Sequence, residues 1–266
     1  MSAQQPLTYQ AVVSLAAADP AVVGLVLFGS QAHEGMVTTR SDHDLYVILA
    51  DGATTDLTEQ RTAELDLAIG SLAEFRAEGM PGGKECPHLT AACGHCDTFP
   101  RYALARATVV LDRLGGDIAR VLADKARLDA DDAFRSSAEW LDAYANSLYR
   151  SVKNDRDGHA LGSRLDAADS IRFLLELLFA LDRRPRPYNK YLSWELARYP
   201  LPDWDTAELL STVDRIARTG DVGLQRRLFA RVEAVARQAG HSEVLDAWGD
   251  DLETICGAVS RVAERP

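Results

Sequence analysis

The sequence has little of several features that define broad classes of protein. Only 4 of its 266 residues are cysteines, so we do not expect a secreted domain held by disulfides. No apolar run is long enough to span a bilayer, and the first residues show no basic segment followed by an apolar one. There is no internal repeat and no low-complexity tract. These absences predict a globular cytoplasmic protein.

Positive charge is also scarce. The chain has 29 Lys and Arg residues against 40 Asp and Glu residues, which gives a formal net charge of −11 and an isoelectric point near 5.0. Extended binding to nucleic acid depends on Lys and Arg side chains that neutralise phosphates, so we do not expect it here. An acidic chain is better suited to a small or cationic partner.

Apolar residues follow different periods in the two halves of the chain. Four short runs rich in Val, Ile and Leu are typical of buried strands: residues 21–28, 44–49, 65–72 and 107–112. Between these runs, residues 56–64 and 71–79 predict short helices, and Ser71 with Glu74 predicts a capping box for the second. The first half therefore predicts a small α/β or α+β sheet domain.

Helical spacing dominates from about residue 115. It extends over residues 117–128, 138–152, 163–182, 205–219 and 224–239. The segment 171–181 is apolar nearly all round, which places it at the centre of a helical bundle. We place the boundary near residue 128, which gives domains at 1–128 and 129–266.

Two carboxylates stand at the start of the second apolar run. Strand interiors disfavour aspartate, so Asp42 and Asp44 call for an explanation. On a strand both side chains would share one face, about 5 to 7 Å apart, with His43 on the other face. Such a pair repels itself unless it holds a cation, and Mg²⁺ prefers oxygen ligands completed by substrate phosphates. The pattern predicts a magnesium site with a nucleotide as co-ligand; the alternative is a solvated loop, residues 38–44, that caps the strand.

Two further features support this prediction. Gly29 and Ser30 follow the first apolar run, where a glycine turn brings backbone amides close to phosphate oxygens. In the third run, alternation places Glu64 and Asp66 on one face. We select Asp66 as a third carboxylate, because Glu64 can be the solvated start of the strand. The alternative for Asp66 is a charge at the strand edge that pairs with an arginine.

Together these residues resemble the nucleotidyltransferase superfamily of the DNA polymerase β type. The small bacterial enzymes that adenylylate antibiotics such as aminoglycosides are the most similar members. The resemblance implies an α+β chain, with a small mixed β-sheet nucleotidyltransferase domain followed by an all-α helical substrate-binding domain. It also implies transfer of a nucleoside monophosphate, AMP from ATP or the equivalent from another nucleoside triphosphate, to a hydroxyl of a small molecule.

The resemblance also implies roles for individual residues. Asp42, Asp44 and Asp66 would be the catalytic metal ligands for one or two Mg²⁺ ions, and Asp66 would either bind the metal or accept the hydroxyl proton. Gly29 and Ser30 would bind the nucleotide. In the helical half, Lys190 resembles a lysine that reaches the triphosphate, with Tyr188 and Arg186 as companions. The dipole of the preceding helix favours basic residues at its end, and prolines stop the helix there. These two effects explain much of the segment around Lys190 without any ligand.

Other interpretations remain open. Arg164, Asp169 and Glu195 could line an acceptor cleft, or could be surface or buried ion pairs. The enzyme could instead modify a protein or an RNA end, as toxin-antitoxin and regulatory nucleotidyltransferases do. A third hypothesis, a binding module without activity, is disfavoured by the three intact aspartates.

One cluster is left outside this scheme. Five donors that zinc accepts lie within eleven residues: Cys86, His88, Cys93, His95 and Cys96. Their spacing is not that of the usual zinc knuckle, so the pattern favours a plain loop over a structural zinc site. A nucleophilic role for Cys93 or Cys96 has still less support.

Overall fold

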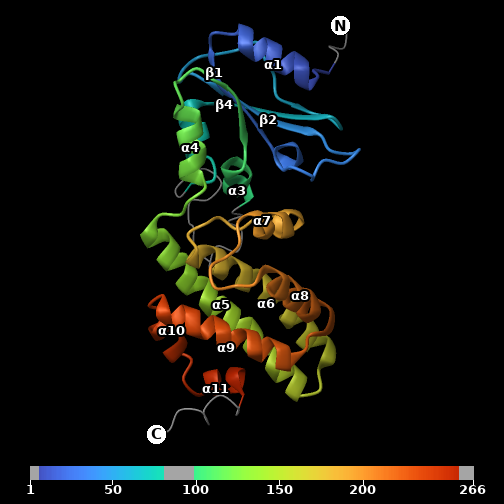
Figure 1. Cartoon of the computed structure of the whole chain (residues 1–266), viewed down its shortest axis with the longest axis vertical. Coiled ribbons are helices and arrows are strands. Elements are labelled where there is room, and N and C mark those ends of the chain that lie inside the picture. The colour runs from blue at the N-terminus through green and yellow to red at the C-terminus, as the bar shows by residue number, and fades with distance from the viewer. Residues whose placement is uncertain (1–5, 81–98, 258–266) are drawn as a thin grey trace. The chain divides into compact units, whose positions relative to one another are not determined.

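The computed structural model describes residues 6–80 and 99–257 and divides into two compact units (Figure 1). The described residues up to Arg127 form the first unit, and those from Leu128 onward form the second. The first contains a small mixed sheet, and the described part of the second is entirely helical. The predicted fold class is therefore confirmed. Within the described ranges, no helix has both the length and the apolar character needed to cross a membrane.

The sheet of the first unit has the strand order β3-β4-β2-β1-β5. Its strands are β1 (Val22–Phe28), β2 (His43–Leu49), β3 (Gln60–Arg61), β4 (Leu65–Ser71) and β5 (Thr108–Asp112). β2 and β4 are parallel, and the other neighbouring pairs are antiparallel. The helices of this unit are α1 (Tyr9–Ala18), α2 (Leu72–Ala77), α3 (Phe99–Ala105) and α4 (Asp117–Lys125), with a 3-10 turn, η1 (Gly29–Ala32).

Helices cover both faces of the sheet. Leu45 and Val47 of β2 pack with α1 on one face. Tyr46 and Ile48 of the same strand pack with residues of α2, α3 and α4 on the other face. This division follows from the period of two along a strand, and it fixes the face to which each polar residue at the strand ends belongs.

The two short helices predicted in this unit had different outcomes. Ser71 and Glu74 form the predicted capping box at the start of α2. The helix predicted over residues 56–64 is wrong, because Gln60 and Arg61 form the edge strand β3 against β4. Helical propensity in a short segment is weak, and the open edge of a buried strand outweighs it.

The second unit is built around two long helices that pack against each other, α5 and α6. Its elements are α5 (Ala130–Arg156), α6 (Ala160–Leu181), η3 (Asn189–Tyr191), α7 (Leu192–Arg198), α8 (Thr206–Thr219), α9 (Val222–Gln238), α10 (Ser242–Asp246) and α11 (Asp250–Cys256). All residues from Leu174 to Ala180 are buried, including Glu176. The prediction of a central helix over 171–181 is therefore confirmed.

A buried lysine ties α4 to α2 in the first unit. Lys125 is fully buried, and its ammonium group donates to the carbonyl oxygens of Arg76 (3.1 Å) and Glu78 (2.6 Å) at the end of α2. It also lies 5.5 Å from the ring centroid of Phe75. Burial lowers the pKa of Lys125 from 10.5 to about 8, against an opposing attraction from Glu78.

We predict that the contribution of Lys125 to the stability of the first unit increases with pH in the alkaline range. Between pH 8 and 10.5 the unfolded chain keeps a proton on Lys125 that the folded chain has released, so this group makes folding more favourable as pH rises through that window. We expect the free energy of unfolding of wild type, minus that of Lys125→Met, to increase between pH 7.5 and 9.5. Urea unfolding followed by circular dichroism measures it, and a constant difference would contradict the prediction.

Candidate active site

The turn after β1 is shaped around Gly29. This residue has a φ of 65°, in the left-handed region that favours glycine, and it opens the turn η1, in which Ser30 is buried. A methyl group at Gly29 would lie 2.7 Å from the carboxyl carbon of Asp44. The Asp44 carboxylate therefore rests against the glycine, and no side chain fits between them.

Asp44 and Asp66 are neighbours in the sheet. They are paired in register on the parallel strands β2 and β4, so their side chains lie on the same face, which is the face covered by α2, α3 and α4. Asp42 lies one residue before β2. His43 belongs to the opposite face, where its ring stacks on Tyr9 of α1 with centroids 4.6 Å apart. The alternation expected between His43 and Asp44 is thus observed, while Asp42 lies outside the strand.

Asp66 has a basic partner. Its carboxylate accepts from Arg61 of β3 at 2.8 and 2.9 Å, which is the ion pair that the sequence left open as an alternative. The Arg61 side chain is 87% exposed and that of Asp66 is 31% exposed. A pair this exposed contributes about 1 kcal/mol at most. Arg61 can therefore yield to a divalent cation, which attracts the carboxylate with twice the charge.

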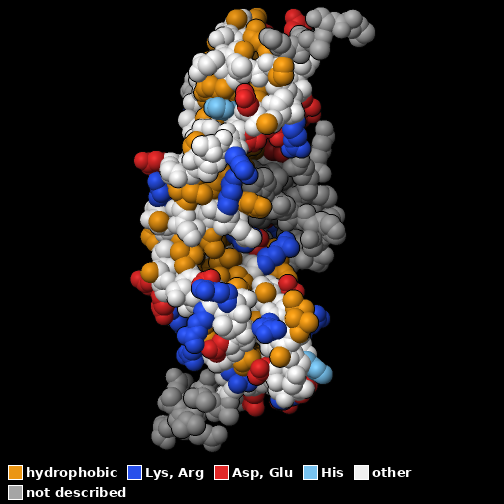
Figure 2. All heavy atoms as spheres, turned by 90° about the vertical axis from the view of Figure 1, so that its right-hand side faces the viewer, with side chains coloured by type: hydrophobic (Ala, Val, Ile, Leu, Met, Phe, Trp, Pro, Cys, Tyr) orange, Lys and Arg blue, Asp and Glu red, His pale blue; other side chains and the backbone are white. Residues whose placement is uncertain are grey.

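The carboxylates do not form a finished metal site by themselves. Across residues 6–80 and 99–257, no group of three or more His, Cys, Asp or Glu side chains is placed to hold a metal ion. Mg²⁺ is usually bound by one or two carboxylates together with substrate phosphates and water. The visible face of the sheet unit carries a group of acidic side chains beside a basic one (Figure 2). Metal binding by Asp42, Asp44 and Asp66 stays a prediction.

Two residues of this region were missed by sequence reasoning. His33 is fully buried, and its Nδ1 donates to the carbonyl oxygen of Gly29 at 2.6 Å. Its Nε2 lies 3.2 Å from the hydroxyl of Tyr102 on α3, which is also buried. In a single sequence nothing separates a buried histidine from an exposed one, and Tyr102 is 69 residues away from His33.

Comparisons with known proteins find similarity at the level of structure. No family model matches the chain, and no curated protein matches it. A solved structure of a nucleotidyltransferase-like protein from Exiguobacterium sibiricum 255-15 is 13% identical to it. The alignment covers 97% of this chain and 80% of that chain, with a TM-score of 0.42.

The residues predicted in the helical half lie in and around η3. Lys190 is exposed, with its ammonium 4.8 Å from the ring centroid of Tyr191, and Tyr188 is 51% exposed. Arg186 pairs with buried Glu176 at 3.6 Å and also donates to Asn189. These contacts give Arg186 a structural role, and its contact with a nucleotide stays a prediction.

The acceptor-cleft candidates of the same half differ in environment. Glu195 is fully buried and pairs with Arg184 at 3.1 Å, which is the ion-pair alternative. Arg164 and Asp169 are exposed on α6. The Cys and His cluster at 86–96 lies outside the described residues.

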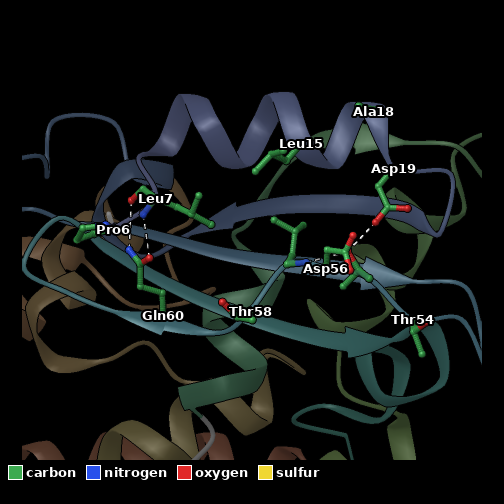
Figure 3. A pocket seen from close by; sticks show the side chains of 11 residues that line it. Pro6, Leu7, Leu15, Ala18, Asp19, Thr54, Asp56, Thr58 and Gln60 are labelled. Carbon is green, nitrogen blue, oxygen red and sulfur yellow. Dashed lines mark hydrogen bonds between the residues drawn. The ribbon is translucent and has the colours of Figure 1, made fainter. Parts of the chain in front are cut away.

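A pocket of about 730 Å³ opens elsewhere in the first unit (Figure 3). It lies between α1 and the segment 54–60, where Asp19 accepts from Thr55 and the side chain of Gln60 bonds the backbone of Leu7. Leu7 and Leu57 in its wall belong to the α1 side of the core. The pocket is therefore on the face of the sheet opposite to Asp44.

Proposed function

We propose that the protein is a magnesium-dependent nucleotidyltransferase. The observation that carries the proposal is that the Asp44 carboxylate rests against Gly29, while Asp66 stands beside Asp44 in register. A glycine turn brings main-chain amides within reach of phosphate oxygens. Carboxylates hold the cation that those phosphates require. One end of the sheet thus offers both halves of a triphosphate site.

The proposed reaction moves a nucleoside monophosphate, AMP from ATP, to a hydroxyl group of a small molecule. The hydroxyl oxygen forms a bond to the α-phosphorus, the bond from the α-phosphorus to the β-bridging oxygen breaks, and pyrophosphate leaves. Gly29 and Ser30 hold the phosphates in line with the incoming oxygen. The hydroxyl proton goes to the carboxylate of Asp66 or to water.

The donor set suits Mg²⁺, because Asp42, Asp44 and Asp66 offer only carboxylate oxygens. When bound, one or two Mg²⁺ ions would neutralise phosphate charge and lower the pKa of the acceptor hydroxyl. To bind the cation, Asp66 would break its exposed ion pair with Arg61.

The proposal also gives a role to the helical unit. It supplies the acceptor site, and its exposed residues Lys190 and Tyr188 contact the nucleotide. A net charge of −11 favours a cationic acceptor, such as an aminoglycoside-like antibiotic, in the cytoplasm.

Labelled nucleotides test the proposal directly. The protein is incubated with each α-labelled nucleoside triphosphate, Mg²⁺ and a panel of hydroxylated small molecules, beside an Asp42→Asn, Asp44→Asn double variant. We expect label on a small molecule and release of pyrophosphate with wild type, both lost in the double variant. Label on protein or RNA would replace the small-molecule acceptor by the alternative class. If no label is transferred and the triphosphate binds equally to wild type and variant, the proposal that the protein is an enzyme of this kind is refuted.

A further inference from the structure

His33 links the turn η1 to a helix of the first unit. The ring spans 2.6 Å from Nδ1 to the Gly29 carbonyl oxygen and 3.2 Å from Nε2 to the Tyr102 hydroxyl oxygen. His33 is 0% exposed and Tyr102 is 1% exposed. The backbone N–H of His33 also donates to the carbonyl of Ser30 at 3.2 Å, which closes the turn. The link is therefore shielded from water on the histidine side.

The chemistry of the partners fixes the proton on the ring. A carbonyl oxygen only accepts, so the Nδ1 atom of His33 must carry the hydrogen. In the neutral ring Nε2 then accepts from the Tyr102 hydroxyl. A neutral imidazole with one donor and one acceptor satisfies both partners and buries no charge.

We infer that His33, supported by Tyr102, is a positioning residue that sets the place of the phosphate turn against the metal-binding carboxylate. The inference rests on the proposed function. The glycine whose carbonyl His33 holds is the same glycine that contacts the Asp44 carboxylate. A shift of Gly29 therefore changes the distance between the amides offered to the triphosphate and the carboxylate offered to its cation. Binding and catalysis that depend on aligned groups are weakened when one of those groups is displaced.

Another histidine that is buried in the described part of the chain serves as a matched control. His241 in the helical unit is 2% exposed, and its Nε2 lies 2.8 Å from the Ser137 hydroxyl. A substitution there removes a buried imidazole and a side-chain hydrogen bond, as at His33, but it touches neither the turn nor the carboxylates. It reports what loss of a buried histidine does through stability alone.

Binding of MgATP tests the inference without requiring a known acceptor. Equilibrium dialysis with labelled ATP and Mg²⁺ is carried out on wild type, His33→Ala, His33→Asn, His33→Gln, Tyr102→Phe and His241→Ala. We expect His33→Ala to weaken binding about tenfold, the factor that corresponds to one well-placed hydrogen bond. His33→Asn should recover to within about threefold of wild type, because its amide nitrogen can donate from near the position of Nδ1. His33→Gln places its nitrogen nearer to Nε2 and should not recover.

Hydrogen exchange gives a second measurement. In His33→Ala, and to a smaller extent in Tyr102→Phe, the amides of Ser30 and Gln31 should exchange faster, while β1 stays protected. His241→Ala should leave both MgATP binding and these amides unchanged. Wild type that binds no MgATP would refute the proposed function together with this inference. Wild type that binds MgATP, with His33→Ala binding equally well, would overturn the inference alone, as would equal losses in His33→Ala and His241→Ala.

Discussion

Asp44→Asn alone is expected to lower Mg²⁺-dependent nucleotidyl transfer about 1,000-fold or more, which corresponds to about 4 kcal/mol of transition-state stabilisation. The amide keeps the shape of the carboxylate beside Gly29 but has no charge to offer a divalent cation. The free energy of unfolding should stay within about 1 kcal/mol of wild type and tend upward, because like charges on neighbouring strands repel. Transfer rates over a Mg²⁺ titration, with urea unfolding alongside, measure both effects.

Asp56→Asn is the matched control for this change. Asp56 belongs to the same unit and undergoes the same loss of charge, but it lines the pocket on the α1 face. We expect it to retain transfer activity. If Asp44→Asn kept more than a tenth of wild-type activity, Asp44 would not be a metal ligand.

The fold could be predicted from the sequence wherever apolar residues formed a continuous run or a regular helical pattern. The runs that became β1, β2, β4 and β5 are bounded and rich in Val, Ile and Leu, and the segment 174–180 is apolar on every side except for Glu176. The edge strand β3 could not be predicted, since its two residues are ordered by the neighbour β4 and not by their own propensities.

In the candidate site, too, features that depend on a distant partner could not be predicted from the sequence. Alternation alone placed His43 on the face opposite to Asp44, because a period of two needs no knowledge of the partner strand. That Asp44 and Asp66 share a face depends on the register of β2 with β4, which alternation within one strand does not give. The pair between Arg61 and Asp66 did not follow, because a helix predicted over residues 56–64 placed Arg61 in the wrong element. His33 was hidden for another reason: it is defined by two partners, a backbone carbonyl and a tyrosine from α3, that no spacing rule connects.

Gly29→Ala is expected to destabilise the first unit by about 2 to 4 kcal/mol, since a positive φ costs an alanine about 1 kcal/mol and the clash with Asp44 adds more. Triphosphate binding should fall with it. All four tryptophans lie after residue 128, so fluorescence would report the helical unit and not this one. Hydrogen exchange of the amides in β1 and β2 is the appropriate measurement.

Gly35→Ala separates the two contributions to this cost. Gly35 has a φ of 79°, similar to that of Gly29, and a methyl group there would meet no atom within 4 Å. It should therefore lose only the backbone part, about 1 kcal/mol. Removing the carboxylate by Asp44→Ala should relieve the clash in Gly29→Ala and leave Gly35→Ala unaffected, with a coupling energy of about 1 to 2 kcal/mol between residues 29 and 44. If the two glycine substitutions cost the same and neither is coupled to Asp44, the carboxylate does not rest against Gly29. The geometry on which the proposed site depends would then be contradicted.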